Sequence, residues 1–148
     1  MSKIIQKLLG DRSIEKYKDY GPLFLRVGLG IVFLLFGYQK LSVPEQTASQ
    51  IQAILNVSLS LAAAANLSMG LAEILLGIGL IAGAFNRYVA PLAAAMVTLI
   101  FVSITLKYGI QNDPSLYRDI AIIGGALCLW FIGPGALSWD NRNKKTIV

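Results

Sequence analysis

Long apolar runs separated by short polar stretches dominate this sequence. A run of about 20 mostly apolar residues is long enough to cross a lipid bilayer as a helix. Four runs of this kind are expected to span a membrane, at 21–41, 67–85, 88–108 and 116–134. Only Asn86 and Arg87 separate the second run from the third, which predicts a tight antiparallel hairpin. The pattern therefore predicts an all-α integral membrane four-helix bundle over 21–140.

The connection between the first two spans has a helical pattern of its own. Ser42 and Glu45 have the spacing of a capping box, with a proline in the first turn. Apolar residues follow at helical spacing, at Ile51, Ile54 and Leu55. We therefore expect an amphipathic helix over 43–56 in the first outer loop. The short apolar stretch 59–66 either dips into the outer leaflet or extends the second span.

Basic residues are unevenly distributed between the two sides of the predicted bundle. Four spans place both termini on the same side, together with the turn at Arg87. That side carries nine basic residues, namely Lys3, Lys7, Arg12, Lys16, Lys18, Arg87, Arg142, Lys144 and Lys145. The opposite loops carry three, namely Lys40, Lys107 and Arg118. The positive-inside rule then predicts that both termini are cytoplasmic.

The two ends of the chain are predicted to lie outside the bundle. Ile4, Ile5, Leu8 and Leu9 share one helical face, so we expect residues 1–20 to form an amphipathic tail on the cytoplasmic leaflet. A disordered tail is the alternative. Residues 141–148 form a basic cytoplasmic tail.

The amino-acid composition excludes several kinds of functional site. The 148 residues are only 14% charged, with no histidine and one cysteine, which excludes an internal disulfide, a Cys/His zinc site and a histidine-ligated haem. We therefore expect no metal site. Cys128 lies in an apolar run and is interpreted as a small buried hydrophobic residue. No basic block interleaved with aromatic residues indicates nucleic acid binding.

Four ionisable residues fall in the outer third of the predicted bundle, namely Lys40, Glu73, Arg118 and Asp119. An unpaired charge in hydrocarbon costs several kcal/mol, so such residues face the interior and pair. We predict an outward-facing polar pocket in which Glu73 meets Lys40 and Arg118, with Asp119, Gly37 and Gln39 beside them. Three roles are possible for such a cluster: it binds a polar or redox-active small molecule, it relays protons, or its ion pairs only join the helices.

Other residues are assigned structural roles. Arg26 lies in the inner third, where Asp140, Asp19 or a lipid phosphate is its expected partner. Small residues at Gly70 and Gly77 allow close helix packing. Pro134 between two glycines ends the last span, and we expect Asp140 to turn back towards Arg87 or Arg26. The remaining structural candidate is Ser138.

Three stretches resemble the DoxX family of small bacterial and archaeal membrane proteins. They are RVGLGIVFLLFGYQKL (26–41), GLAEILLGIGLIAGAFNR (70–87) and RDIAIIGGALCLWFIGPGALSWD (118–140). The family motifs fall here on Arg26, Gly37, Lys40, Gly70, Glu73, Gly83, Arg87, Gly133 to Gly135, Ser138 and Asp140. The resemblance covers nearly all of 21–140 and implies a four-helix membrane bundle in the bacterial cytoplasmic (inner) membrane.

The resemblance also implies a class of function. Relatives named DoxD resemble a subunit of a thiosulfate:quinone oxidoreductase, and others are associated with oxidative-stress complexes or the maturation of periplasmic redox enzymes. The chain is thus expected to be an accessory subunit with quinone as its candidate cofactor, and with the bilayer and membrane or periplasmic redox subunits as partners. A proton-coupled small-solute transporter and a ligand-free structural or assembly subunit remain as alternatives.

Overall fold

The computed structural model describes residues 17, 20–110, 114 and 116–144. Within these ranges all regular structure is helical, which confirms the predicted all-α class. The elements are α3 (Tyr20–Ser42), α4 (Pro44–Leu55), α5 (Leu59–Ala82), α6 (Asn86–Tyr108), α7 (Leu116–Ile132) and α8 (Trp139–Lys144). Most of the predicted amphipathic tail, at residues 1–16, 18 and 19, and the last residues of the basic tail, 145–148, lie outside the described residues, and Tyr20 already belongs to α3.

Three of these helices are long and apolar enough to cross a membrane. The helices α3, α5 and α6 have 23, 24 and 23 residues, which corresponds to about 35 Å each at 1.5 Å per residue. A typical hydrocarbon core is about 30 Å thick. The 17 residues of α7 coincide with most of the fourth predicted span. The chain is thus a multi-pass membrane protein.

Two helix boundaries differ from the sequence-based prediction. Helix α5 begins at Leu59, so the stretch 59–66 extends the second span. Helix α4 confirms the predicted helix over 43–56, but the predicted capping box is wrong: its N-cap is Val43, which makes no side-chain bond. Ser42 still belongs to α3, and its hydroxyl donates to the Gln39 carbonyl within that helix.

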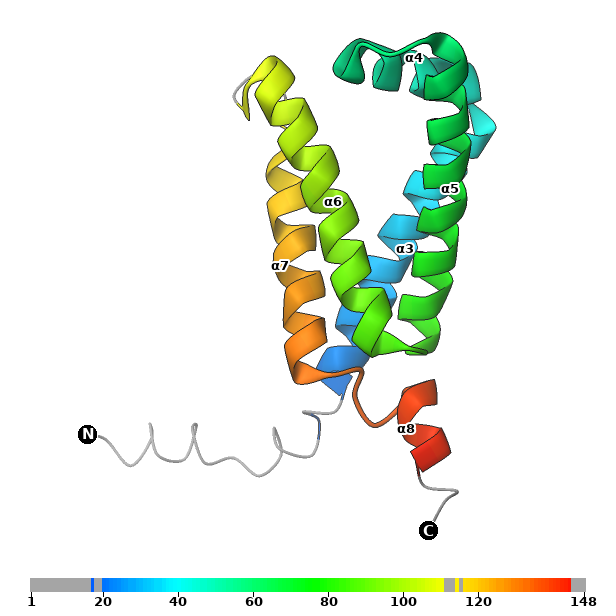
Figure 1. Cartoon of the computed structure of the whole chain (residues 1–148). Helices are drawn as coiled ribbons and strands as arrows, with labels where there is room; N and C mark the ends of the chain where they lie inside the picture. Colours follow the sequence, from blue (N-terminus) through cyan, green and yellow to red (C-terminus); the bar gives the residue numbers. More distant parts are fainter. Residues whose placement is uncertain (1–16, 18–19, 111–113, 115, 145–148) are drawn as a thin grey trace, which may run out of the picture.

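The helices pack in two pairs. Helix α3 lies along α5, and α6 lies along α7, whereas contacts between the two pairs are fewer. In Figure 1 the pairs lie closer at the end near α8 and diverge towards the other end, where α4 crosses the end of α5. The bundle is therefore tighter at the α8 end than at the α4 end.

Glycines bring α3 and α5 into close contact. A methyl group added at Gly37 would lie 2.7 Å from the Gly70 carbonyl oxygen, and one added at Gly30 would lie 2.8 Å from that of Gly77. Both distances are too short for a real side chain. Because lipid tails are as apolar as the helices, such close backbone packing is what holds membrane helices together.

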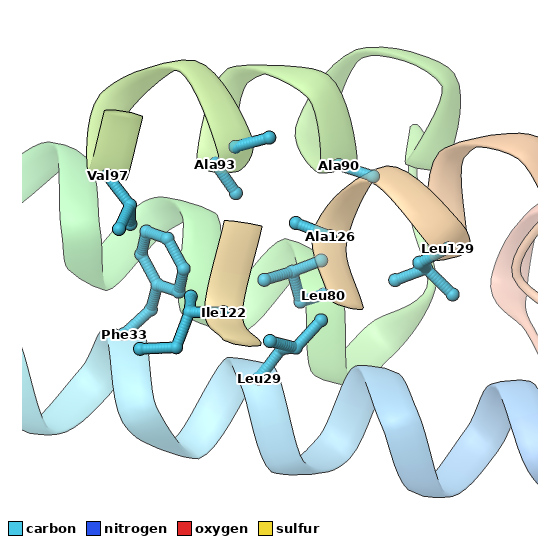
Figure 2. Close-up of a cluster of buried hydrophobic side chains, with 10 residues drawn as sticks. Leu29, Phe33, Leu80, Ala90, Ala93, Val97, Ile122, Ala126 and Leu129 are labelled. Atoms are coloured by element: carbon cyan, nitrogen blue, oxygen red, sulfur yellow. The ribbon is translucent and has the colours of Figure 1, made fainter. Parts of the chain in front are cut away.

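A small apolar core joins the two pairs (Figure 2). It contains Leu29 and Phe33 from α3, Leu80 from α5, Ala90, Ala93, Ala94 and Val97 from α6, and Ile122, Ala126 and Leu129 from α7. Large apolar side chains also cover the outside, including Leu106 at 83% exposure and Phe131 at 78%. An apolar exterior around a small core is typical of helices surrounded by lipid.

Candidate functional site

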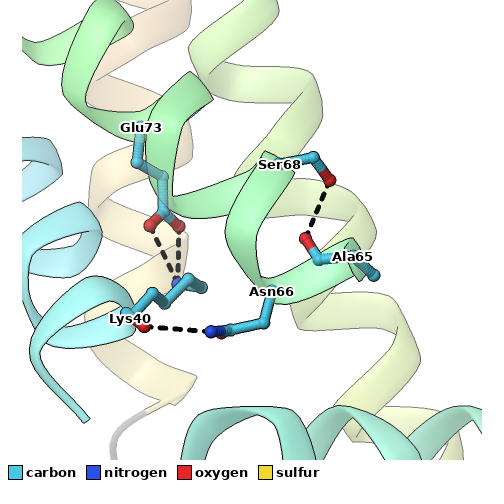
Figure 3. A network of polar contacts seen from close by, with 5 residues as sticks. All are labelled: Lys40, Ala65, Asn66, Ser68 and Glu73. Atoms are coloured by element: carbon cyan, nitrogen blue, oxygen red, sulfur yellow. Dashed lines mark hydrogen bonds and ion pairs between the residues drawn. The ribbon is translucent and has the colours of Figure 1, made fainter. Parts of the chain in front are cut away.

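An ion pair between α3 and α5 is the centre of the candidate site (Figure 3). The Lys40 ammonium contacts both carboxylate oxygens of Glu73, at 2.7 and 2.9 Å. The Glu73 side chain is 2% exposed and that of Lys40 is 17% exposed. The pairing removes the cost of an isolated charge in an apolar bundle. The structure thus brings together the two residues on which the predicted pocket depends.

Arg118 does not join this pair, contrary to the prediction that it contacts Glu73. Its Nε donates to the neighbouring Asp119 at 3.2 Å, within the first turn of α7. Because the guanidinium bonds to its own helix, more than half of the Arg118 side chain stays exposed. Asp119 itself is buried. The four charges therefore form two pairs, one between helices and one within α7.

Phe36 lies between these pairs and was missed by the sequence analysis. Its ring centroid lies 4.9 Å from the Arg118 guanidinium carbon and 5.9 Å from the Lys40 nitrogen. The negative face of an aromatic ring attracts cations at such distances. Phe36 precedes Lys40 by one helical turn, and that spacing was the signal available in the sequence.

Asn66 is the second residue that the sequence analysis missed. Its amide nitrogen donates to the Lys40 carbonyl at 2.9 Å, which satisfies a carbonyl in the last turn of α3 (Figure 3). The Asn66 side chain is buried, and its oxygen has no partner among the described residues. Asn66 lies just before the predicted second span, and it is the first amide in an otherwise apolar stretch.

A cavity of about 690 Å³ lies beside Lys40 and Asn66. It is lined by residues of α3, α4 and α5, namely Lys40, Leu41, Pro44, Glu45, Ala48, Ser49, Gln52, Leu59, Ala63, Asn66 and Leu67. Of the six predicted pocket residues only Lys40 lines it, whereas Glu73, Arg118, Asp119, Gly37 and Gln39 do not. Gly37 packs against the α5 backbone, and the Gln39 side chain is exposed. Helical rotation turns each away from the cavity.

A second polar centre lies at the other end of the bundle. Arg26 is 2% exposed, and its Nη2 donates to the Leu137 carbonyl at 2.7 Å. Its Nε and Nη1 have no partner among the described residues. Among the described residues, the hydrogen-bond partner of Arg26 is thus a main-chain carbonyl and not Asp140, while Asp19 lies outside the described residues and a lipid phosphate stays a prediction. Gly83 packs against the guanidinium.

Asp140 turns back to the α5–α6 turn, but it does not bind an arginine there. Its carboxylate accepts hydrogen bonds from the backbone nitrogens of Phe85 and Asn86, both at 2.8 Å. These donors belong to the first turn of α6, so the carboxylate caps that helix. Arg87 is exposed, within the first turn of α6.

The segment after α7 supports this cap. Helix α7 ends at Ile132, before Gly133 and Pro134, and Gly133 has a φ of 82°. Ser138 is fully buried, donates to the Gly135 carbonyl at 2.8 Å, and accepts from the backbone nitrogen of Asn141. These bonds hold the turn that presents Asp140.

The last candidates for chemistry are a metal site and the single cysteine. Among residues 17, 20–110, 114 and 116–144, no group of three or more His, Cys, Asp or Glu side chains could hold a metal ion. The prediction that Cys128 is buried is wrong, because its side chain is exposed on the outer surface of α7. It therefore faces the surroundings of the bundle.

Fold and site define a small helical membrane protein with one polar centre near each end. The DoxX family matches residues 21–106, which is more than half of the chain. The chain therefore belongs to the DoxX family, as its motifs indicate. The match includes Lys40 and Glu73, and it ends before α7. No curated protein and no solved structure matches the chain significantly.

Proposed function

We propose that this protein is an accessory subunit of a membrane oxidoreductase or an oxidative-stress complex, and that the cavity beside Lys40 binds a quinone. The observation that carries the proposal is that Lys40, which pairs with Glu73, lines a cavity of about 690 Å³. A pair that served only to join helices would need no neighbouring cavity. The two alternatives are a proton-coupled transporter and a ligand-free assembly subunit.

The pair has the chemistry that a quinone needs. An ammonium group has three N–H donors, and Lys40 directs its nitrogen at the two oxygens of Glu73. Its third donor can reach a quinone carbonyl from the cavity, because the Lys40 side chain is partly exposed. The Glu73 side chain is 2% exposed and does not line the cavity. Lys40 is therefore the member of the pair that can exchange the proton that accompanies reduction of a quinone carbonyl, while Glu73 orients the ammonium group.

The electrons must come from elsewhere. The chain has no histidine and one cysteine, and that cysteine lies on α7 far along the sequence from the pair. Side chains of this protein therefore supply hydrogen bonds and protons, while a redox partner or cofactor supplies electrons. This division of roles is the reason for proposing an accessory subunit instead of a complete enzyme.

The proposal includes a topology. In it, α7 is the fourth span and completes a four-helix bundle in the bacterial inner membrane. Both termini and the turn at Arg87 are cytoplasmic, in agreement with the excess of basic residues on that side. The Lys40–Glu73 pair and α4 then lie in the outer half of the bilayer.

Purification from native membranes tests the proposal. The wild-type protein should retain a quinone, measured by solvent extraction and mass spectrometry, together with a redox subunit. Glu73→Gln and Lys40→Met should retain at least tenfold less quinone. Lys107→Met is the matched control, because Lys107 is exposed and does not line this cavity, and it should behave like the wild type.

Other outcomes decide between the alternatives. Wild-type protein that carries neither quinone nor a redox subunit contradicts the proposal. Solute uptake into liposomes driven by a pH gradient, and lost in Glu73→Gln, would favour the transporter. A folded Lys40→Met/Glu73→Leu double variant that still supports the complex would favour an assembly role.

A further inference from the structure

A second cleft lies between α4, α5 and α6, away from the ion pair. It has a deep region with a volume of about 290 Å³ and an outer region with a volume of about 440 Å³. The two regions share Ile54 of α4 and Ile104 of α6. They are therefore adjacent, on either side of this pair of isoleucines.

The deep region is apolar. It is lined by Ile51, Ile54, Leu55, Met69, Met96, Leu99, Ile100, Ser103 and Ile104. Its one hydroxyl is already used, because Ser103 donates to the Leu99 carbonyl at 2.7 Å. Two methionines, Met69 and Met96, add flexible side chains that adapt to an irregular apolar ligand. This region suits a hydrocarbon chain and offers no free donor to a polar group.

The outer region mixes polar and apolar side chains and is uncharged. It adds Ser49, Gln50 and Tyr108 to the shared isoleucines, and no described residue that lines either region is charged. A phosphate or carboxylate head would find no charged side chain to pair with among these lining residues. Ser49 already donates to the Gln46 carbonyl at 2.7 Å and so offers an acceptor, while the Gln50 amide offers both a donor and an acceptor to the hydroxyl groups of an uncharged head.

The two regions of the cleft lie at different depths along the bundle, as the head and the tail of a bilayer lipid do. Figure 1 shows α4 at the same end of the bundle as the last turns of α6. From Met96 to Ile104 the deep region runs along α6 for about 12 Å, at 1.5 Å per residue. The outer region therefore lies at the end of the bundle and the apolar region lies deeper, as an amphiphile's head and tail do in one leaflet.

We propose that this cleft binds an uncharged amphiphile with one long hydrocarbon chain, its head at Ser49, Gln50 and Tyr108 and its chain between Ile54 and Met96. The site is separate from the Lys40–Glu73 pair and does not depend on the function proposed for that pair. Helix α4 forms one wall of the cleft, and α6 forms the other.

Photolabelling in nanodiscs tests this site. The probe is a monoacylglycerol with a diazirine in its chain, and labelled peptides are mapped by mass spectrometry. Labelling should concentrate on α4 and on the α6 stretch from Met96 to Ile104. An excess of unlabelled monoolein should reduce it at least fivefold. A lysophosphatidic acid with the same diazirine chain should label these peptides at least fivefold less.

A pair of tryptophan variants adds a steric test. Ile104→Trp fills the cleft and should lower labelling at least fivefold. Leu106→Trp is the control, because Leu106 is 83% exposed on the same helix and lines neither region. Glu73→Gln should label like the wild type, which separates this result from that of the quinone experiment.

Three results would overturn the site. One is labelling spread evenly over the apolar exterior with no competition by monoolein, which needs no variant to fold. The second is equal labelling by the charged and uncharged probes. The third is a folded Ile104→Trp variant that labels as Leu106→Trp does.

Discussion

The guanidinium of Arg26 packs directly against Gly83, with Nη1 in the space that a methyl group on Gly83 would occupy. Arg26 lies on α3 and Gly83 follows α5, so the contact joins the first two long helices at the α8 end. The same guanidinium donates to the Leu137 carbonyl beyond α7. Arg26 thereby holds three distant segments of the chain together.

Gly83→Ala should therefore be strongly destabilising. Gly83 has a φ of 63°, which strains any residue with a side chain. The added methyl group must also displace the buried guanidinium. We expect a loss of at least about 1–3 kcal/mol, measured as unfolding free energy in detergent micelles.

Gly124→Ala provides the control for that experiment. A methyl group at Gly124 meets nothing within 4 Å, and alanine favours a helix over glycine by up to about 1 kcal/mol. The control should be neutral or slightly stabilising. If both variants had the same unfolding free energy, the contact between Arg26 and Gly83 would not contribute to stability.

Asp140→Ala should weaken the start of α6. The variant loses both hydrogen bonds to Phe85 and Asn86, together with a negative charge at a helix N-terminus. Removing such a cap costs about 1–2 kcal/mol. Asp140→Asn should lie between the wild type and Asp140→Ala, because the amide keeps one acceptor. Hydrogen exchange at the first turn of α6 reports the loss locally.

The exposed Glu45 is a control for this prediction. Glu45 lies in the first turn of α4, with its side chain exposed, so Glu45→Gln should change stability by less than about 0.5 kcal/mol. If the first turn of α6 exchanged hydrogen at the same rate in Asp140→Ala as in the wild type, the cap would not be needed for the stability of that turn.

Lys40→Met should destabilise the protein more than Arg118→Met does. Removal of Lys40 leaves the buried carboxylate of Glu73 unpaired, which costs about 3–5 kcal/mol. Arg118 is more than half exposed and bonds within its own helix, so its removal should cost about 1 kcal/mol or less. Thermal unfolding in micelles compares the two.

The double variant Lys40→Met/Glu73→Gln measures the coupling between the two residues. With both charges gone, much of the stability lost in Lys40→Met should return. Strictly additive losses in this cycle would mean that the two groups do not interact in the folded protein.

Cysteine labelling tests the proposed topology. In a Cys128→Ala background, a membrane-impermeant maleimide added to intact cells should label Glu45→Cys and should leave Arg87→Cys unlabelled until the cells are lysed. Both positions are exposed, on α4 and at the start of α6. If only Arg87→Cys were labelled in intact cells, the orientation of the protein would be opposite to the proposed one.

Much of the fold could be predicted from the sequence because lipid imposes a strong length requirement. Three of the four predicted spans coincide with helices long enough to cross a membrane, the fourth coincides with the 17-residue α7, and the apolar spacing located α4 as well. The boundary errors lie where local signals were ambiguous. Ser42 has a capping side chain, but only one residue separates α3 from α4, so it stays in α3.

The site was predictable only to a limited extent. Lys40 and Glu73 could be paired from sequence because isolated charges are costly in an apolar bundle and both were expected at the same depth. The partner of Arg118 could not be predicted from sequence, because a neighbour on the same helix competes with a residue across the bundle. Phe36 and Asn66 are uncharged, so the cost of an isolated charge does not identify them, and the spacing of Phe36 one turn before Lys40 is only a weak signal.

The sequence by itself determined the class of this protein, because the length and charge of apolar runs decide whether a helix can lie in lipid. Only the tertiary structure decided the details of contact, such as the rotation that exposes Gln39 and Cys128 and the bond from Arg26 to a main-chain carbonyl. It also decided the two clefts on either side of α4. These features depend on how helices rotate and lean against one another, and that follows from packing many side chains at once.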